Sequence, residues 1–161
     1  MTELRLAMKD EVTAELNRIA GRLKHPQKLM AGIAQELRTI TFDNFEKESS
    51  DGEKWQQLSS KTIDARKKKG HWPGKMLRVS AGGLASSVSA FSSAGEAGIG
   101  ASKVYAAIQQ LGGQAGRGKK VTIPARPYLP MKKSGDGFEL TKDARDSILE
   151  MMEGFIGRGA V

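Results

Sequence analysis

The apolar residues of the first 45 positions recur every three or four residues, and this spacing constrains the fold more than any other feature. A first stripe consists of Leu4, Met8, Val12, Leu16, Ile19 and Leu23. A second stripe consists of Leu29, Ile33, Leu37 and Ile40 and runs toward Phe45. Such spacing places apolar side chains on one face of a helix. Proline is tolerated in the first turn of a helix, so we predict two helices that break near His25 and Pro26.

The middle of the chain has a different pattern, with short stretches rich in glycine, serine and alanine between residues 82 and 100. Val88 and Ala90 alternate with serines, which predicts a strand with one buried face. A second short strand is predicted over Ala97–Gly100. Residues 104–111 are expected to form one or two helical turns that end at the glycine pair 112–113. Extended structure resumes at residue 121, and two prolines keep residues 123–129 out of a helix.

Two further helices are indicated by capping residues. Ser59 or Ser60 can cap a short helix that ends near Lys69, and Thr141 can cap a last helix from Lys142 to Gly157. The predicted class is α+β, with the N-terminal helices and the C-terminal helix packed on a small antiparallel sheet formed by strands around residues 84–100 and 121–129. We expect a single domain over residues 1–161. Residues 51–161 would form its core, and the helical residues 1–50 either pack on that core or reach a neighbouring subunit.

Composition excludes several classes of protein. The 161 residues contain no cysteine, so disulfides and thiolate metal sites are excluded. The two histidines, His25 and His71, are far apart in sequence, and we predict neither a metal site nor a cofactor. No apolar run approaches the roughly 20 residues of a membrane helix. The first six residues lack the apolar region of a signal peptide, so we expect synthesis in the cytoplasm and no membrane contact.

No catalytic motif is evident, and we predict that the protein is not an enzyme. There is no Gly-x-Ser-x-Gly elbow, and neither histidine adjoins a plausible serine. The glycine-rich run 112–120 lacks the spacing of a phosphate loop, because Lys120 is followed by Val121 where a hydroxyl is needed. The enzymatic alternative is a hydrolase that uses a serine and His71, and it requires a convergent polar pocket.

The chain is basic, with a formal net charge of +8. Such a charge attracts nucleic acid or an acidic partner, so a sequence-independent DNA-binding protein is an alternative function. Residues 112–120 are predicted to form a mobile hairpin loop that carries Arg117, Lys119 and Lys120. The basic run 66–69 is either the solvated end of a helix or a phosphate contact.

Arg126 lies between Pro124 and Pro127, which restrict its backbone. A guanidinium held in this way loses less entropy when it binds a carboxylate. We consider two roles for Arg126, a contact with a neighbouring subunit and a brace for the domain's own C-terminal helix.

Three segments in succession resemble one protein family. The first is Trp-Gln-Gln-Leu-Ser-Ser-Lys-Thr at residues 55–62, followed by a basic stretch, and the second is Met-Leu-Arg-Val-Ser-Ala-Gly-Gly-Leu-Ala-Ser-Ser-Val at 76–88. The third leads from Tyr-Ala-Ala-Ile-Gln-Gln-Leu-Gly-Gly at 105–113 to Ile-Pro-Ala-Arg-Pro-Tyr-Leu at 123–129. Their order resembles the virion morphogenesis and tail completion proteins of Mu-like and related contractile-tailed phages. This chain departs from that pattern at Gln109, where histidine is usual, at residues 81–84, and at Tyr128, where phenylalanine is usual.

The resemblance implies a structural α+β protein of the virion, synthesised in the host cytoplasm and located at the head–tail neck. It implies a tail completion or tail terminator protein that forms a homo-oligomeric ring, commonly a hexamer, and binds the tail tube or the head–tail connector. A capsid assembly factor is the alternative. In a ring, Arg117, Lys119 and Lys120 would contact lumenal DNA transiently or touch the tail tube. Arg126, Tyr128, Tyr105 and Trp55 would lie at the subunit interface.

Overall fold

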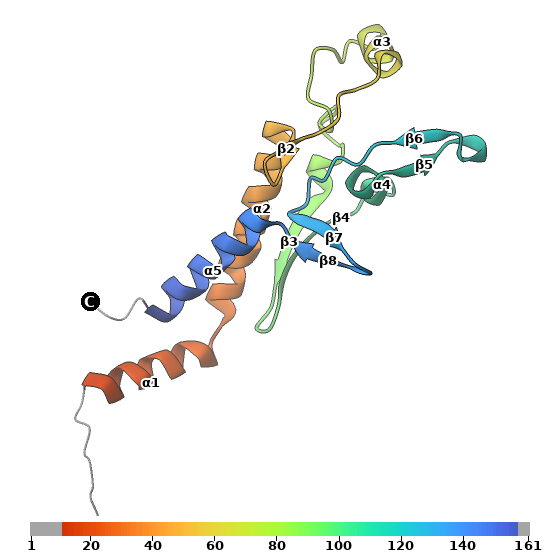
Figure 1. Cartoon of the computed structure of the whole chain (residues 1–161). Coiled ribbons are helices and arrows are strands. Elements are labelled where there is room, and N and C mark those ends of the chain that lie inside the picture. Colours follow the sequence, from red (N-terminus) through yellow and green to blue (C-terminus); the bar gives the residue numbers. More distant parts are fainter. Residues whose placement is uncertain (1–10, 158–161) are drawn as a thin grey trace, which may run out of the picture.

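The structure, a computed structural model, describes residues 11–157 (Figure 1). The helices in this range are α1 (Glu11–Lys24), α2 (Gln27–Lys47), α3 (Ser60–Lys68), α4 (Ala106–Leu111) and α5 (Lys142–Gly157), with short 3-10 turns at Ala85–Ser87 and Arg117–Lys119. The strands are β1 (Ser49–Ser50), β2 (Glu53–Lys54), β3 (Val88–Ser92), β4 (Ala97–Ala101), β5 (Gly113–Ala115), β6 (Val121–Ile123), β7 (Met131–Ser134) and β8 (Gly137–Leu140). The predicted α+β class is confirmed.

The predicted helices form where the sequence indicated them. Helix α1 ends just before His25, and α2 begins after Pro26. Ser59 caps α3 by accepting a hydrogen bond from the Thr62 backbone N–H, at 3.3 Å. Helix α5 begins directly after Thr141 and has the bounds that we predicted. Leu4 and Met8 of the first predicted stripe lie outside the described residues.

The strands pair as four separate antiparallel hairpins, β1–β2, β3–β4, β5–β6 and β7–β8. The prediction of one sheet built from residues 84–100 and 121–129 was therefore wrong. Strand β6 stops at Ile123, because the prolines that follow lack the N–H groups that a ladder needs. The remaining residues of that segment cross the interior of the molecule without strand pairing and reach β7.

Helix α2 is the centre of the fold (Figure 1). It packs against β3 and β4 and also against α5. The last helix therefore packs mainly on α2, and its Ile148 meets Ile99 of β4 in a shared cluster. The expectation that the first helix covers the sheet was wrong, because α1 turns away at His25 and its main contact is with α5.

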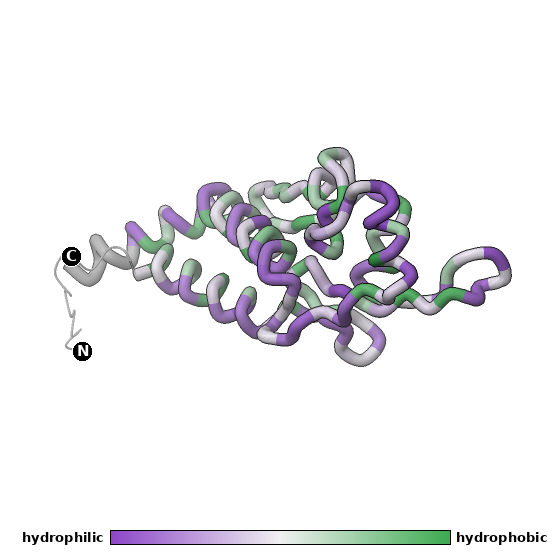
Figure 2. The backbone as a smooth tube through the Cα atoms, turned by 90° about the horizontal axis from the view of Figure 1, so that it is seen from above, coloured by the Kyte–Doolittle hydropathy of each residue, from purple (hydrophilic) through white to green (hydrophobic). Residues whose placement is uncertain are grey.

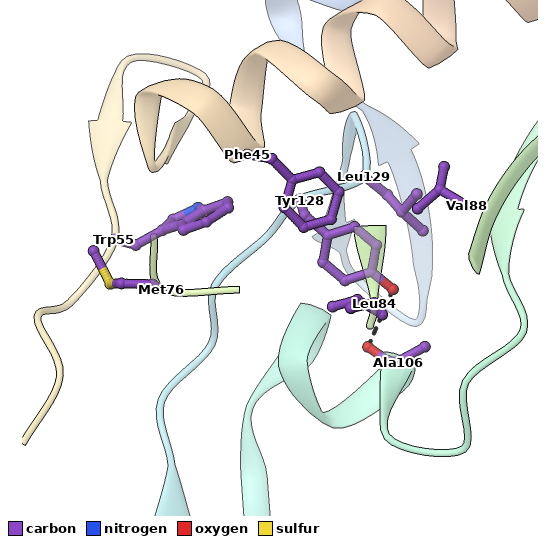
Figure 3. Close-up of a cluster of buried hydrophobic side chains, with 8 residues drawn as sticks. All are labelled: Phe45, Trp55, Met76, Leu84, Val88, Ala106, Tyr128 and Leu129. Carbon is purple, nitrogen blue, oxygen red and sulfur yellow. Dashed lines mark hydrogen bonds between the residues drawn. The ribbon is translucent and has the colours of Figure 1, made fainter. Parts of the chain in front are cut away.

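Two apolar clusters hold these elements together. The smaller one joins Ile33 and Leu37 of α2 to Ala144 of α5. Figure 3 shows the larger one, which gathers Phe45, Trp55, Met76, Leu84, Val88, Ala106, Tyr128 and Leu129 from six parts of the chain. The Tyr128 ring stacks on Phe45 at 5.1 Å between centroids, and the Trp55 ring meets Phe45 edge-on at 6.2 Å. The segment that contains Tyr128 thus lies at the middle of the core.

Candidate functional site

The side chain of Gln110 holds the segment that crosses the core. Its Oε1 accepts hydrogen bonds from the backbone N–H groups of Tyr128 and Leu129, each at 2.9 Å. Its Nε2 donates to the Met131 carbonyl at 3.2 Å. Buried backbone groups need partners, and a glutamine can serve both donors and acceptors where no neighbouring strand does so.

Two more side chains secure the same segment. Asn44 donates from Nδ2 to the Tyr128 carbonyl at 3.1 Å, and Trp55 donates from Nε1 to the Pro127 carbonyl at 3.0 Å. The Tyr128 hydroxyl donates to the Ala106 carbonyl (Figure 3). Burial raises the pKa of Tyr128 to about 12. Trp55 and Tyr128 are therefore core residues of the protomer, in place of the subunit contacts that we expected.

Arg126 is also internal, with 6% of its surface exposed. Its Nε donates to the Gln56 carbonyl at 3.1 Å, and a terminal nitrogen donates to the Gln57 carbonyl at 3.4 Å. Burial lowers the pKa of Arg126, nearby Arg66 lowers it further, and Glu48 opposes both effects. Neither role that we considered is found, because Arg126 braces the irregular segment that leads into α3.

A groove of about 530 Å³ lies between the start of α3, residues 76–84 and the α4–β6 region. Its lining includes Arg66, Tyr105, Gln109 and Arg126, but no histidine or carboxylate. The Gln109 Oε1 is buried without a hydrogen-bond partner among the described residues. Tyr105, with 41% of its surface exposed, is the one expected interface residue that remains available to a neighbour. The groove lacks the general base that the hydrolase alternative needs, and His71 is exposed and does not line it.

The β5–β6 hairpin projects from the body as an arm, which we define as residues 113–123 (Figure 1). The predicted hairpin is confirmed. Arg117, Lys119 and Lys120 lie around its tip and are exposed. Figure 2 shows that the arm reaches well beyond the rest of the chain, with a hydrophilic tip. The structure therefore places the three predicted contact residues on one protruding element.

The second basic cluster, at the end of α3, is divided between two roles. Arg66 turns inward and donates to the carbonyls of Lys75 and Met76. Lys68 and Lys69 are exposed, as expected for the solvated end of a helix.

The family model for the phage virion morphogenesis family matches residues 8–156 of the chain. The chain belongs to this family. Within the phage virion morphogenesis family, the chain is 32% identical over 146 residues to "Mu-like prophage FluMu G protein 2" of Haemophilus influenzae, which covers 91% of this chain and 95% of the relative. It is 33% identical over 107 residues to "Putative capsid assembly protein G" of Escherichia phage Mu, over 65% of this chain and 68% of that protein. No solved structure matches.

The segments that carried the family resemblance build the core of the protomer. Trp55, Gln110 and the 123–129 segment meet in one hydrogen-bonded core. Sequence reasoning missed Gln110 and Asn44, whose polar side chains have no distinguishing pattern of their own. The nearest signal was the position of Gln110 inside the 105–113 motif.

Within residues 11–157, no group of three or more metal-ligating side chains is found. Among the described helices, none is long and apolar enough to cross a bilayer.

Proposed function

We propose that this protein is a non-enzymatic structural component of the head–tail neck, where copies close into a ring, commonly of six, that completes the tail and joins it to the head. Membership of the virion morphogenesis family supports a role in particle assembly. The ring would bind the tail tube or the connector, and the arm would face one of three surfaces: lumenal DNA, the tail tube or a neighbouring subunit.

The observation that carries oligomerisation is the surface that the protomer leaves uncovered. The arm projects from the body and carries three exposed cations and Val121, which is 53% exposed. On α5, the apolar side chains Leu149, Met152 and Ile156 are also exposed. Exposed apolar surface of this kind marks contact sites between proteins, and two such regions give a subunit two places to meet its neighbours in a ring.

A capsid assembly factor is the second candidate, because the name of the phage Mu relative assigns that protein to capsid assembly. The two roles predict different defects when the gene is deleted from its phage. Loss of a neck protein leaves complete heads and complete tails that do not join, whereas loss of a capsid factor leaves few or aberrant heads.

Electron microscopy of lysates from the deletion, with and without the gene supplied in trans, tests the proposal. We expect unjoined heads and tails without the gene and infectious particles with it. Normal joined particles without the gene would contradict the neck role. Duplex DNA binding by the isolated protein, with a steep salt dependence, would instead support the DNA-binding alternative.

A further inference from the structure

We infer that the arm of one copy docks on the outer face of α5 in the next copy, an interface that rests on the ring proposed above. We define the outer face as Leu149, Met152 and Ile156 with the adjoining Glu150 and Glu153. The arm and the outer face are different surfaces, so the contact is heterologous and propagates from copy to copy.

Helix α5 has two apolar stripes, of which the protomer covers only one. Ala144, Ile148, Met151 and Phe155 form one stripe, and it faces α2 and α1. Leu149, Met152 and Ile156 follow the same helical spacing on a second face and are 50%, 39% and 42% exposed. Three large apolar side chains on one exposed helix face form a contiguous patch, which soluble proteins use for contacts.

Acidic side chains flank this second stripe. Glu153 lies four residues after Leu149 and three before Ile156, so it borders the stripe, and Glu150 lies three residues before Glu153, on the side away from Met152. Neither glutamate has an ion-pair partner within residues 11–157. The outer face therefore offers an apolar strip with an unneutralised negative edge.

The arm has the complementary chemistry. Arg117, Lys119 and Lys120 give it three positive charges that have no carboxylate partner in the described part of the chain. Val121 follows directly and is 53% exposed. Opposite charges around an apolar contact favour one orientation of docking and disfavour others. The arm has the opposite charge to the outer face and a similar apolar character.

The arm also lacks support inside its own protomer. An isolated two-stranded hairpin is marginally stable in water, and β5 and β6 make their main contacts with each other and the tip. A docking surface on another molecule supplies the missing cover. Because a helix face can take the side of a hairpin without pairing its edge, the contact leaves the register of the arm unchanged.

The positions of the two surfaces favour an intermolecular contact. The arm and the C-terminal half of α5 lie at opposite ends of the molecule in both views (Figures 1 and 2). One protomer therefore cannot satisfy both surfaces. A head-to-tail contact of this kind closes into a ring or continues as a filament, according to the rotation between copies.

Cysteine crosslinking tests the contact directly, because the natural chain has no cysteine. We use the single variants K120C and E153C, apart and mixed, together with the double variant. Under mild oxidation we expect the mixture to give one dimer and the double variant to give a ladder of multimers. The matched pair K68C and E153C should give no product above background. Absence of the mixed dimer, or equal crosslinking by the K68C pair, overturns the inference.

Charge exchange tests whether the complementary charges drive docking. We expect R117E/K120E, or E150K/E153K, to raise the concentration of half-assembly by about tenfold in sedimentation experiments. The four changes combined in one chain should largely restore assembly. The control variants K68E/K69E and E96K/D136K alter exposed charges elsewhere by the same amounts and should change it less than twofold.

The outcomes separate this inference from the proposed function. Unchanged assembly in R117E/K120E, with loss of binding to duplex DNA or to isolated tail tubes, would give the arm a different partner and overturn the inference while leaving the neck role intact. If K120C and E153C crosslink as expected while the deletion phage still joins heads to tails, the interface is supported and the neck role is contradicted.

Discussion

The arm and the segment that follows it are neighbours in sequence, yet one is exposed and the other is buried. Residues 113–122 are largely in solvent, whereas Arg126, Tyr128 and Leu129 lie inside the molecule. Both segments are extended. The difference lies in what satisfies their backbone groups, because the arm pairs with itself and the buried segment is held by side chains of Gln110, Asn44 and Trp55.

If the arm docks as proposed, this contrast separates stability from assembly. The buried segment joins α2, α4 and β7 and has no surface to offer a partner. The arm has surface and charge but contributes little to the fold. Substitutions in the buried segment should therefore lower the free energy of unfolding, whereas substitutions in the arm should mainly weaken self-association.

The largest effect on stability is expected for Tyr128→Ala. The ring stacks on Phe45 and fills the centre of the larger cluster, so its removal should lower the free energy of unfolding by about 3–5 kcal/mol. Tyr105→Ala is the matched control at an exposed tyrosine and should cost less than about 1 kcal/mol. Urea unfolding of both variants measures the difference. Equal costs would show that the buried segment is not the structural centre.

Gln110→Ala should have the next largest effect. It leaves two buried backbone N–H groups without their acceptor, which should cost about 2–4 kcal/mol. Gln109→Ala is the control one residue away, and it removes a buried oxygen that has no partner among the described residues, so the change should be near neutral. Thermal unfolding compares the two. A larger loss for Gln109→Ala would contradict the role that we assign to Gln110.

Alkaline pH should destabilise the buried segment through Tyr128. Its pKa is about 12 in the folded protein and near 10 in the unfolded chain, so the unfolded state loses its proton first. Stability is fully present below pH 10 and falls as pH rises toward 12. Between pH 9 and 11 this tyrosine should contribute a loss of about 1 kcal/mol, which Tyr128→Phe should abolish and Tyr105→Phe should not. An identical slope in wild type and Tyr128→Phe would refute the assignment.

The smallest effect on stability is expected in the arm. Val121→Ser should change the free energy of unfolding by less than about 0.5 kcal/mol, because the side chain is exposed. It should nevertheless weaken self-association in sedimentation experiments. Val88→Ser, at a buried position, should cost stability without any specific effect on association between folded molecules. If Val121→Ser unfolds the protein, the arm is part of the core and the comparison fails.

Much of the fold could be predicted, because helical periodicity and caps are local signals. Pro26, Ser59 and Thr141 marked helix starts correctly, and β3, β4 and β6 lay where short extended segments were expected. Strand β5 lies in the run that was expected to be a loop. The β7–β8 hairpin was missed because its strands are mostly exposed and lack alternation. The β1–β2 hairpin was not predicted as a strand pair, since each strand has only two polar residues.

The candidate site was harder to predict because it depends on contacts between distant residues. A buried aromatic has the same local pattern whether its cover comes from its own chain or from a neighbour. Trp55, Arg126 and Tyr128 were therefore assigned to a subunit boundary, and the structure gives them partners from residues 44–57 and 106–110 of the same chain. The exposed cations of the arm were found because charge without apolar anchors is itself a local signal.

Gly112 links the two regions and has a geometric consequence for assembly. It ends α4 with φ at 72°, and a β-carbon there would lie 2.8 Å from the Ala125 backbone nitrogen. The residue at which the arm leaves the body is therefore packed closely against the backbone at which the arm returns, and a side chain there would force the two apart. In a head-to-tail assembly the angle at which the arm leaves the body determines the rotation from one subunit to the next. If the arm docks as proposed, a bulkier residue at position 112 would change that rotation, and with it the symmetry number or the closure of the ring.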